Sequence, residues 1–179
     1  MVIALVFLSS FAAAQQSDQA IAERVLGPQW KQLSRRAGMI FAGTVLWTPA
    51  QAATTKTATI QTATAPTAAT DRAVPGTTPA VELSFRVDEA IAGVEPGQVL
   101  TVHEWAGAWA MHCPMSKGQH ILIFLYPPSR LGLTSPVGGS LGQVALDLTG
   151  KKVTGKNLSQ SVSVIQLERA IRSARNEVE

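Results

Sequence analysis

The alternation of apolar and polar residues in VELSFRV, residues 81–87, constrains the fold more than any other stretch of the chain. Val, Leu, Phe and Val take every second position, and Glu, Ser and Arg take the positions between them. Because successive side chains of a β-strand point to opposite faces, this segment fits a sheet with one buried and one polar face. The chain therefore needs partner strands and a core on one side of them.

Four further segments have strand character. Residues 39–47, MIFAGTVLW, are apolar at nearly every position, which is typical of a strand that is covered on both faces. Three shorter runs lie at 99–105, 120–126 and 143–148, and glycine or proline flanks each of them closely. These segments predict a small antiparallel barrel of about five strands.

Helical periodicity occurs toward both ends of the chain. Residues 17–37 are predicted to form a helix that is interrupted at Gly27 and Pro28. Near the C-terminus, Ser163 is the predicted N-cap of a helix, because Gln166 follows three residues later. The predicted apolar stripe of this helix is Ile165, Leu167, Ala170, Ile171 and Ala174. The fold class is therefore mainly β with flanking helices, an α+β arrangement.

Residues 48–80 separate the first two strand segments and consist largely of threonine and alanine, with four prolines. Such a composition buries too little apolar surface to offset the entropy lost on ordering. We predict a disordered loop here, inserted within one β-barrel domain that spans residues 15–179.

The first fourteen residues are predicted to be a signal peptide. An apolar run at 2–11 is followed by three alanines, the small-residue pattern that precedes a cleavage site, and the run is too short to span a bilayer. Cleavage after Ala14 would leave a periplasmic or secreted chain without an integral membrane span. Because no Lys or Arg precedes the apolar run, a start further upstream and a buried N-terminal helix or strand are alternatives.

Cys113 is the single cysteine, so an internal disulfide is excluded. Its thiol is free, paired with another chain or bound to a metal. The formal net charge of +3 over 179 residues produces only a weak field. We therefore expect no nucleic-acid partner.

Residues 138–142, GGSLG, match the G-x-S-x-G pattern that places a serine on the nucleophile elbow of a hydrolase. That elbow joins a strand to a helix, and the histidine base follows the serine along the chain. Here the flanking pattern is strand, loop, strand, and all three histidines precede Ser140. We interpret these glycines as residues that take positive φ in a tight turn or let another backbone approach closely. We predict no catalytic residue and expect that the protein is not an enzyme.

Possible metal ligands are His103, His112 and Cys113, a soft donor set that suits copper or zinc. Adjacent residues reach one tetrahedral ion with difficulty, and no C-x-x-C, H-x-H or H-E-x-x-H spacing is present. We keep periplasmic metal handling as the alternative function and predict no cofactor. Asp88 and Glu89, a close carboxylate pair, are expected to leave opposite faces of a strand.

Two tryptophans flank the sequence AGA and would form an exposed aromatic platform, because an indole offers apolar area and one hydrogen-bond donor. The alternative is packing in the core or at its edge. With the loops at 106–117 and 129–142, this platform predicts a non-catalytic binding or structural module of the bacterial cell envelope. Its partner would be an envelope protein or a glycan. The candidate binding residues are Trp105, Trp109, His112, Cys113 and Ser140.

The order MIFAGTVL, VELSFRVDEAIAGVEPGQVLTV, a cysteine and KGQHILIFL resembles the netrin-like, or tissue-inhibitor-of-metalloproteinase-like, domains over about half the chain. This resemblance implies a five-stranded OB-fold barrel with a helix packed on it. The inhibitors of that family chelate a protease zinc through a cysteine at the mature N-terminus and carry several disulfides. A mature chain that begins near Gln15 has neither feature, so the resemblance does not imply inhibition.

Overall fold

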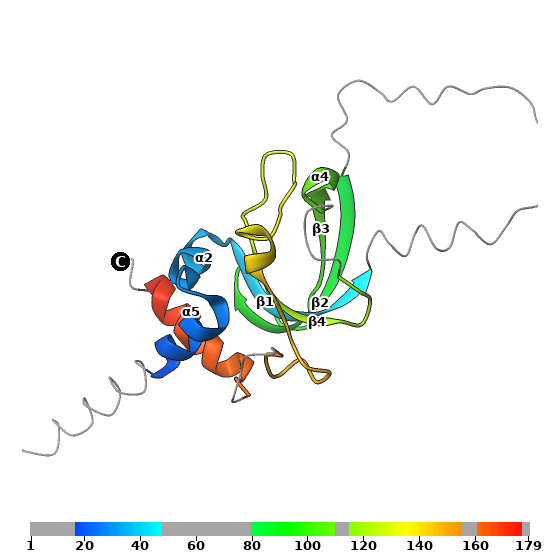
Figure 1. Ribbon diagram of the computed structural model, residues 1–179. Helices are drawn as coiled ribbons and strands as arrows, with labels where there is room; N and C mark the ends of the chain where they lie inside the picture. The colour runs from blue at the N-terminus through cyan, green and yellow to red at the C-terminus, as the bar shows by residue number, and fades with distance from the viewer. Residues whose placement is uncertain (1–16, 48–79, 110–114, 155–160, 177–179) are drawn as a thin grey trace, which may run out of the picture.

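The computed structural model describes residues 17–47, 80–109, 115–154 and 161–176. The predicted signal peptide, nearly all of the predicted Thr/Ala loop, and the candidate residues His112 and Cys113 lie outside these ranges. The described residues form a five-stranded antiparallel sheet, with the helices at 17–26, 30–36 and 164–176 grouped at one side of it (Figure 1). The predicted class, mainly β with flanking helices, is confirmed.

The strand order in the sheet is β3-β2-β1-β4-β5, and every neighbouring pair is antiparallel. The order is compatible with an OB-like sheet. β5 is shorter than predicted, because Leu146 leaves it to form an isolated bridge with Val153. The strands are β1 (Met39–Trp47), β2 (Ala80–Ala92), β3 (Val99–Trp105), β4 (His120–Leu125) and β5 (Gln143–Ala145).

The prediction of a closed barrel is wrong, because β3 and β5 are the edge strands of the sheet and do not pair with each other. Within the described residues, β3 meets the segment after β4 at one isolated parallel bridge, between His103 and Leu133. The N–H of Thr134 donates to the His103 carbonyl there, at 2.8 Å. This segment has prolines at 127, 128 and 136, which lack the N–H that a continuous ladder requires.

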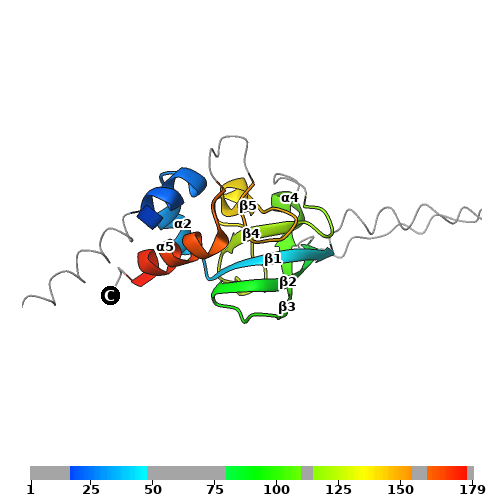
Figure 2. The same ribbon diagram turned by 90° about the horizontal axis from the view of Figure 1, so that it is seen from below.

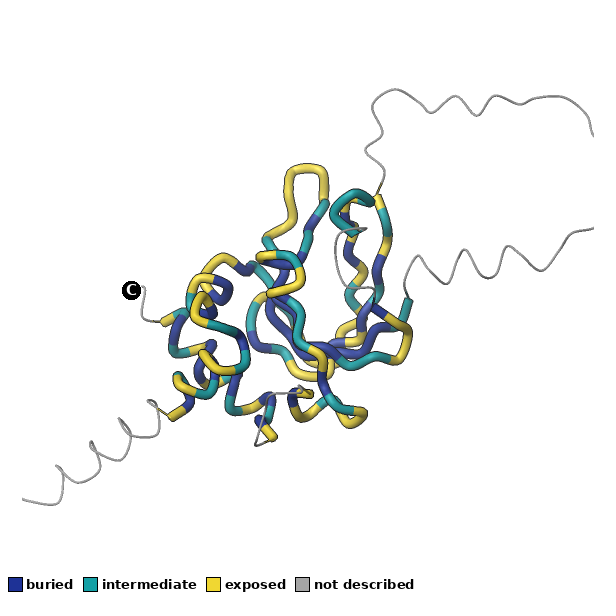
Figure 3. The backbone as a smooth tube through the Cα atoms, in the orientation of Figure 1, coloured by how far each residue is buried: buried dark blue, intermediate teal, exposed yellow. Residues whose placement is uncertain are grey.

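β1 lies at the centre of the sheet and is buried on both faces, as its apolar sequence predicts (Figure 3). Ile40 and Ala42 face a first core cluster, which the sheet shares with the helices. Phe41 and Val45 face a second cluster on the other side of the sheet, where the Phe41 ring meets the Phe85 ring edge-on at a centroid distance of 5.7 Å. The alternation of β1 thus divides the core into two layers.

The helices pack together beside the sheet (Figure 2). The first covers residues 17–26 and the next is α2 (Trp30–Arg36), so the predicted break at Gly27 and Pro28 is confirmed. The last is α5 (Val164–Asn176). Two short helical turns, α4 (Ala106–Trp109) and η2 (Gly139–Gly142), lie after β3 and before β5.

Arginines join the C-terminal ends of α2 and α5. Nη1 of Arg175 donates to the Ala37 carbonyl at 2.8 Å, and Nε of Arg35 donates to the Ala174 carbonyl at 3.1 Å. The last carbonyls of a helix lack partners within it and carry partial negative charge. Each arginine therefore donates to a carbonyl at the C-terminal end of the other helix.

α5 begins at the predicted N-cap. The Gln166 N–H donates to Oγ of Ser163 at 3.3 Å, and the Ser163 N–H donates to Oε1 of Gln166 at 3.1 Å, which is a capping box. The predicted stripe is wrong at Ile165, which is 61% exposed. Ile165 lies two residues before buried Leu167, which corresponds to a rotation of about 200° around the helix. Val164 takes the core-facing position in its place.

This assignment predicts different costs for two truncations in α5. Leu167→Ala leaves a cavity in the first core cluster and should lower the free energy of unfolding by about 2–5 kcal/mol. Ile165→Ala removes an exposed side chain and should change it by less than about 0.5 kcal/mol. Urea unfolding of both variants is the measurement, and equal losses would contradict the orientation of α5.

Candidate functional site

The structure separates the predicted binding residues. Trp105, at the end of β3, is 47% exposed, whereas Trp109 is half-buried and packs against the second core cluster. For Trp109 the packing alternative is therefore confirmed. Ser140 lies exposed in η2 and lines a different cleft from that of Trp105.

Trp105 lines an open groove of about 320 Å³, which we call the Trp105 groove. Trp105 and Ala108 form one side of it, and the loop after β4 forms the other. None of the described residues that line the groove is charged, and together they combine aromatic, apolar and hydroxyl groups. The loop residues that line it are Tyr126, Pro127, Ser129, Leu133, Thr134 and Ser135.

Internal hydrogen bonds fix the loop that forms this groove. Oγ1 of Thr134 donates to the Tyr126 carbonyl at 2.6 Å. Oγ of Ser129 accepts from the N–H groups of Leu131 and Leu133, at 3.3 and 3.2 Å. The groove is therefore largely formed before any ligand binds, which reduces the entropy lost on binding.

Gly107 sets how the Trp105 indole lies. A Cβ at Gly107 would stand 2.5 Å from Cη2 of the Trp105 ring, well inside van der Waals contact. Because glycine lacks a Cβ, the indole can lie against the backbone of α4. The sequence AGA between the two tryptophans therefore has a steric role.

Among the described residues, Ser140 has no acid–base partner in its cleft. The cleft has a volume of about 180 Å³, and its other lining residues are Met115, Gln119, Ile121, Gln143, Val144 and Ala145. Gly138 and Gly139 have φ of +70° and +66°, and a Cβ at Gly142 would collide with the carbonyl oxygen of Val137. The interpretation of these glycines as turn and close-approach residues is confirmed.

A β-bulge in β2 produces a second candidate site, which the sequence reasoning missed. The pairing with β1 shifts between residues 42 and 43, so Asp88 is an extra residue without a partner of its own. Val87 and Ala90, on either side of the acidic pair, both pack on the second core cluster. Asp88 and Glu89 therefore share the outer face, and the prediction that they leave opposite faces is wrong.

Three side chains hold the Asp88 carboxylate. Oγ1 of Thr44 donates to Oδ2 at 2.6 Å, Nε of Arg86 donates to Oδ1 at 2.9 Å, and Nδ1 of His120 lies 3.5 Å from Oδ2. Partial burial raises the pKa of Asp88, but the hydrogen bonds from Thr44 and Arg86 outweigh it and leave this pKa below its usual value. Asp88 is thus an oriented carboxylate at neutral pH.

Thr44, His120 and Asp88 do not form a nucleophile relay. Nδ1 of His120 lies 3.2 Å from Oγ1 of Thr44 and 3.5 Å from Oδ2 of Asp88, so both partners face the same ring nitrogen. In a catalytic triad, the nucleophile and the acid contact different ring nitrogens. This arrangement orients Asp88 and does not activate the Thr44 hydroxyl.

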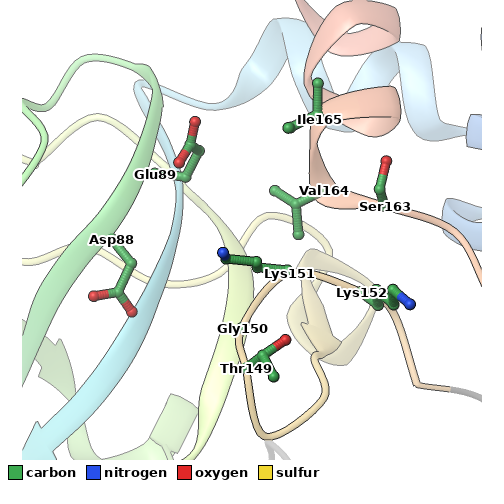
Figure 4. Close-up of a pocket in the computed structure, with 9 residues that line it drawn as sticks. All are labelled: Asp88, Glu89, Thr149, Gly150, Lys151, Lys152, Ser163, Val164 and Ile165. Atoms are coloured by element: carbon green, nitrogen blue, oxygen red, sulfur yellow. The ribbon is translucent and has the colours of Figure 1, made fainter.

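Asp88 and Glu89 form one wall of a cleft of about 540 Å³ (Figure 4), which we call the Asp88 cleft. Figure 4 shows Lys151 directed from the opposite wall toward these carboxylates, whereas Lys152 is directed away from them. The turn before Val153 and the start of α5 supply the other lining residues, which are Thr149, Gly150, Lys151, Lys152, Ser163, Val164 and Ile165.

Two sets of contacts fix the turn that carries the lysines. Oδ1 of Asp147 accepts from the N–H groups of Lys151 and Lys152, at 3.0 and 3.2 Å. Gly150 lies against His120, since a Cβ there would stand 2.8 Å from Nδ1 of the ring. His120 therefore contacts both the turn and the Asp88 network, and the two walls of the cleft are held together.

Glu104 is a buried carboxyl on the inner face of β3, with an exposed fraction of 1%. Burial raises the pKa of Glu104 to about 7. The side chain lines neither the Trp105 groove nor the Asp88 cleft. We therefore expect the ionisation of Glu104 to affect the stability of the protein and not to affect ligand binding at either site directly.

The metal alternative gains no support from the part of the chain that the structure describes. Those residues contain no group of three or more His, Cys, Asp or Glu side chains that could hold an ion. His103 is exposed on the opposite face of β3 from Glu104. The other two proposed ligands, His112 and Cys113, lie outside the described residues.

Comparison of the chain with protein-family models, curated proteins and solved structures yields no match. The resemblance to netrin-like domains stays a prediction. Among the described helices, none has the length and hydropathy needed to cross a bilayer. Fold and site therefore define the protein at the level of its class, an α+β protein with an open five-stranded antiparallel sheet.

Glu104 is predicted to make stability depend on pH. Its pKa is about 7 when folded, above the ordinary value of 4.5, so the folded state binds the proton more tightly. The free energy of unfolding should therefore fall as pH rises from about 4.5 to about 7, by up to about 3 kcal/mol.

Urea unfolding at pH 5 and pH 8 measures this dependence. Glu104→Gln, which cannot ionise, should remove most of the difference in free energy of unfolding between the two pH values. Glu82→Gln, an exposed change on β2, is the matched control and should behave as the unaltered protein does. An unchanged pH dependence in Glu104→Gln would show that another group causes it.

Proposed function

We propose that the protein is a non-catalytic binding module of the bacterial cell envelope and that it recognises a glycan through the Trp105 groove. The observation that carries this proposal is the half-exposed Trp105 indole in a preformed groove without charged lining residues. Such a combination of aromatic surface and a few polar groups is typical of ligand sites.

The chemistry of the groove suits a sugar ring. A pyranose presents a face of C–H groups, which packs on an indole, and a rim of hydroxyls, which bond to hydroxyl and backbone groups. The groove offers the Trp105 ring together with the hydroxyls of Ser129 and Ser135. A neutral sugar requires no compensating charge in its site, and the described lining residues carry none.

The backbone of β3 favours a glycan over an extended peptide. Peptides often bind by adding a strand to a free sheet edge. Beside Trp105, however, the loop already contacts this edge, because the His103 carbonyl accepts the N–H of Thr134. Strand addition at this point would require the loop to leave, whereas a sugar that stacks on the indole would not.

Export is part of the proposal, because an envelope glycan lies outside the cytoplasm. The apolar run at 2–11 and the alanines before Gln15 support it. We expect the mature protein, purified from a bacterium that expresses the full chain, to begin at Gln15. Ala14→Arg should block cleavage, and N-terminal sequencing reads both results. A cytoplasmic protein that keeps Met1 would contradict export.

The binding proposal predicts that Trp105 determines glycan affinity. The measurement is calorimetry with neutral oligosaccharides, including chains of β-1,4-linked N-acetylglucosamine. Trp105→Ala should weaken binding about tenfold or more, because it removes the stacking surface. Gly107→Ala should also weaken binding, because the added Cβ displaces the indole.

Trp47→Ala is the matched control, since it removes an indole that does not line the groove. Its affinity should equal that of the unaltered protein. The proposal fails if none of the oligosaccharides binds, or if the Trp47 and Trp105 variants lose affinity equally. Peptide binding that depends on Trp105 would instead identify a peptide module.

A further inference from the structure

We propose that the Asp88 cleft binds a small zwitterion of the amino acid or short-peptide class. The ligand ammonium would lie at Asp88 and Glu89, and the ligand carboxylate at Lys151. This inference concerns a different surface from the Trp105 groove and does not rest on glycan binding.

The acidic wall is built to hold a cation. The bulge directs two consecutive carboxylates into one cleft, and bulges often re-aim side chains at binding sites. Asp88 is fixed by Thr44 and Arg86, yet each carboxylate oxygen can accept a further hydrogen bond. Among the described residues, Glu89 forms no ion pair, so its full charge is available to a ligand.

The opposite wall supplies the complementary charge. Lys151 is directed toward the two carboxylates (Figure 4), but it pairs with neither of them within the described chain. Its backbone N–H is held by Asp147, so the root of the side chain is fixed. A ligand that carries both charges would pair with both walls, whereas a simple anion or cation would meet repulsion from one of them.

The start of α5 contributes chiefly apolar contact. The N–H groups of Val164 and Gln166 already donate to the Lys151 carbonyl and to Oγ of Ser163. Lys151 is therefore the cation that we assign to the ligand carboxylate. The exposed side chain of Ile165 borders the cleft beside Val164 and offers apolar surface for a ligand side chain.

The dimensions also fit this ligand class. A volume of about 540 Å³ lies within the range of small-molecule sites and exceeds what an ion with its waters needs. The walls are tied to each other through His120, which contacts both Gly150 and the Asp88 network. The fold therefore sets the distance between the backbone positions that carry the opposite charges, which favours ligands of matching length.

The test uses the dipeptide alanyl-leucine as the probe, with calorimetry on the full mature chain. We expect saturable binding that weakens about tenfold when the dipeptide is N-acetylated and likewise when it is C-amidated. Glu89→Gln should reproduce the first loss and Lys151→Gln the second. Neither substitution touches the core, because both side chains are exposed.

Glu95→Gln and Lys117→Gln are matched controls, because they remove exposed charges of the same types outside the cleft. They should leave dipeptide affinity unchanged, as should Trp105→Ala, which separates this proposal from glycan binding. The absence of binding at millimolar dipeptide would overturn the inference. So would equal binding of the blocked dipeptides, or binding that Glu89→Gln and Lys151→Gln leave intact.

Discussion

The burial of β1 on both faces is the constraint on which the rest of the structure depends. A strand with apolar side chains on each face must have a layer packed against each. Here the helices form one layer, and the curvature of the sheet over its own side chains forms the other. The pairing with β2 and β4 on either side then fixes β1 at the centre, and both candidate sites lie at the margins of this core.

Much of this arrangement can be predicted from the sequence, because the spacing of apolar residues along a strand or helix reflects which of its faces are buried. Alternation identified β2, continuous apolar character identified β1, and the pairing of Ser163 with Gln166 marked the start of α5. Each of these signals is local. The structure confirms the existence of these elements, because in each the local preference agrees with the burial that the fold requires.

The features that sequence reasoning missed depend on tertiary register. An ideal strand puts Asp88 and Glu89 on opposite faces, and the pairing with β1 shows that Asp88 is an extra residue. One local signal was available: two acidic residues between Val87 and Ala90 break the alternation, as a bulge would. Ile165 shows the same limit, since one apolar residue at the start of a helix is ambiguous until its rotation relative to Leu167 is considered.

The open sheet explains why the chain has two separate surfaces with different chemistry. If β3 had formed a continuous ladder with the segment after β4, that segment would cover the whole edge of the sheet beside Trp105. A single bridge at His103 instead leaves room for a neutral groove at that edge. At the middle of the sheet, no edge is available, and the chain creates a site by bulging β2 outward beneath the turn at Gly150. The Trp105 groove therefore exists because β3 pairs with the loop after β4 at only one bridge. The Asp88 cleft has two adjacent carboxylates because a bulge interrupts the pairing of β1 with β2.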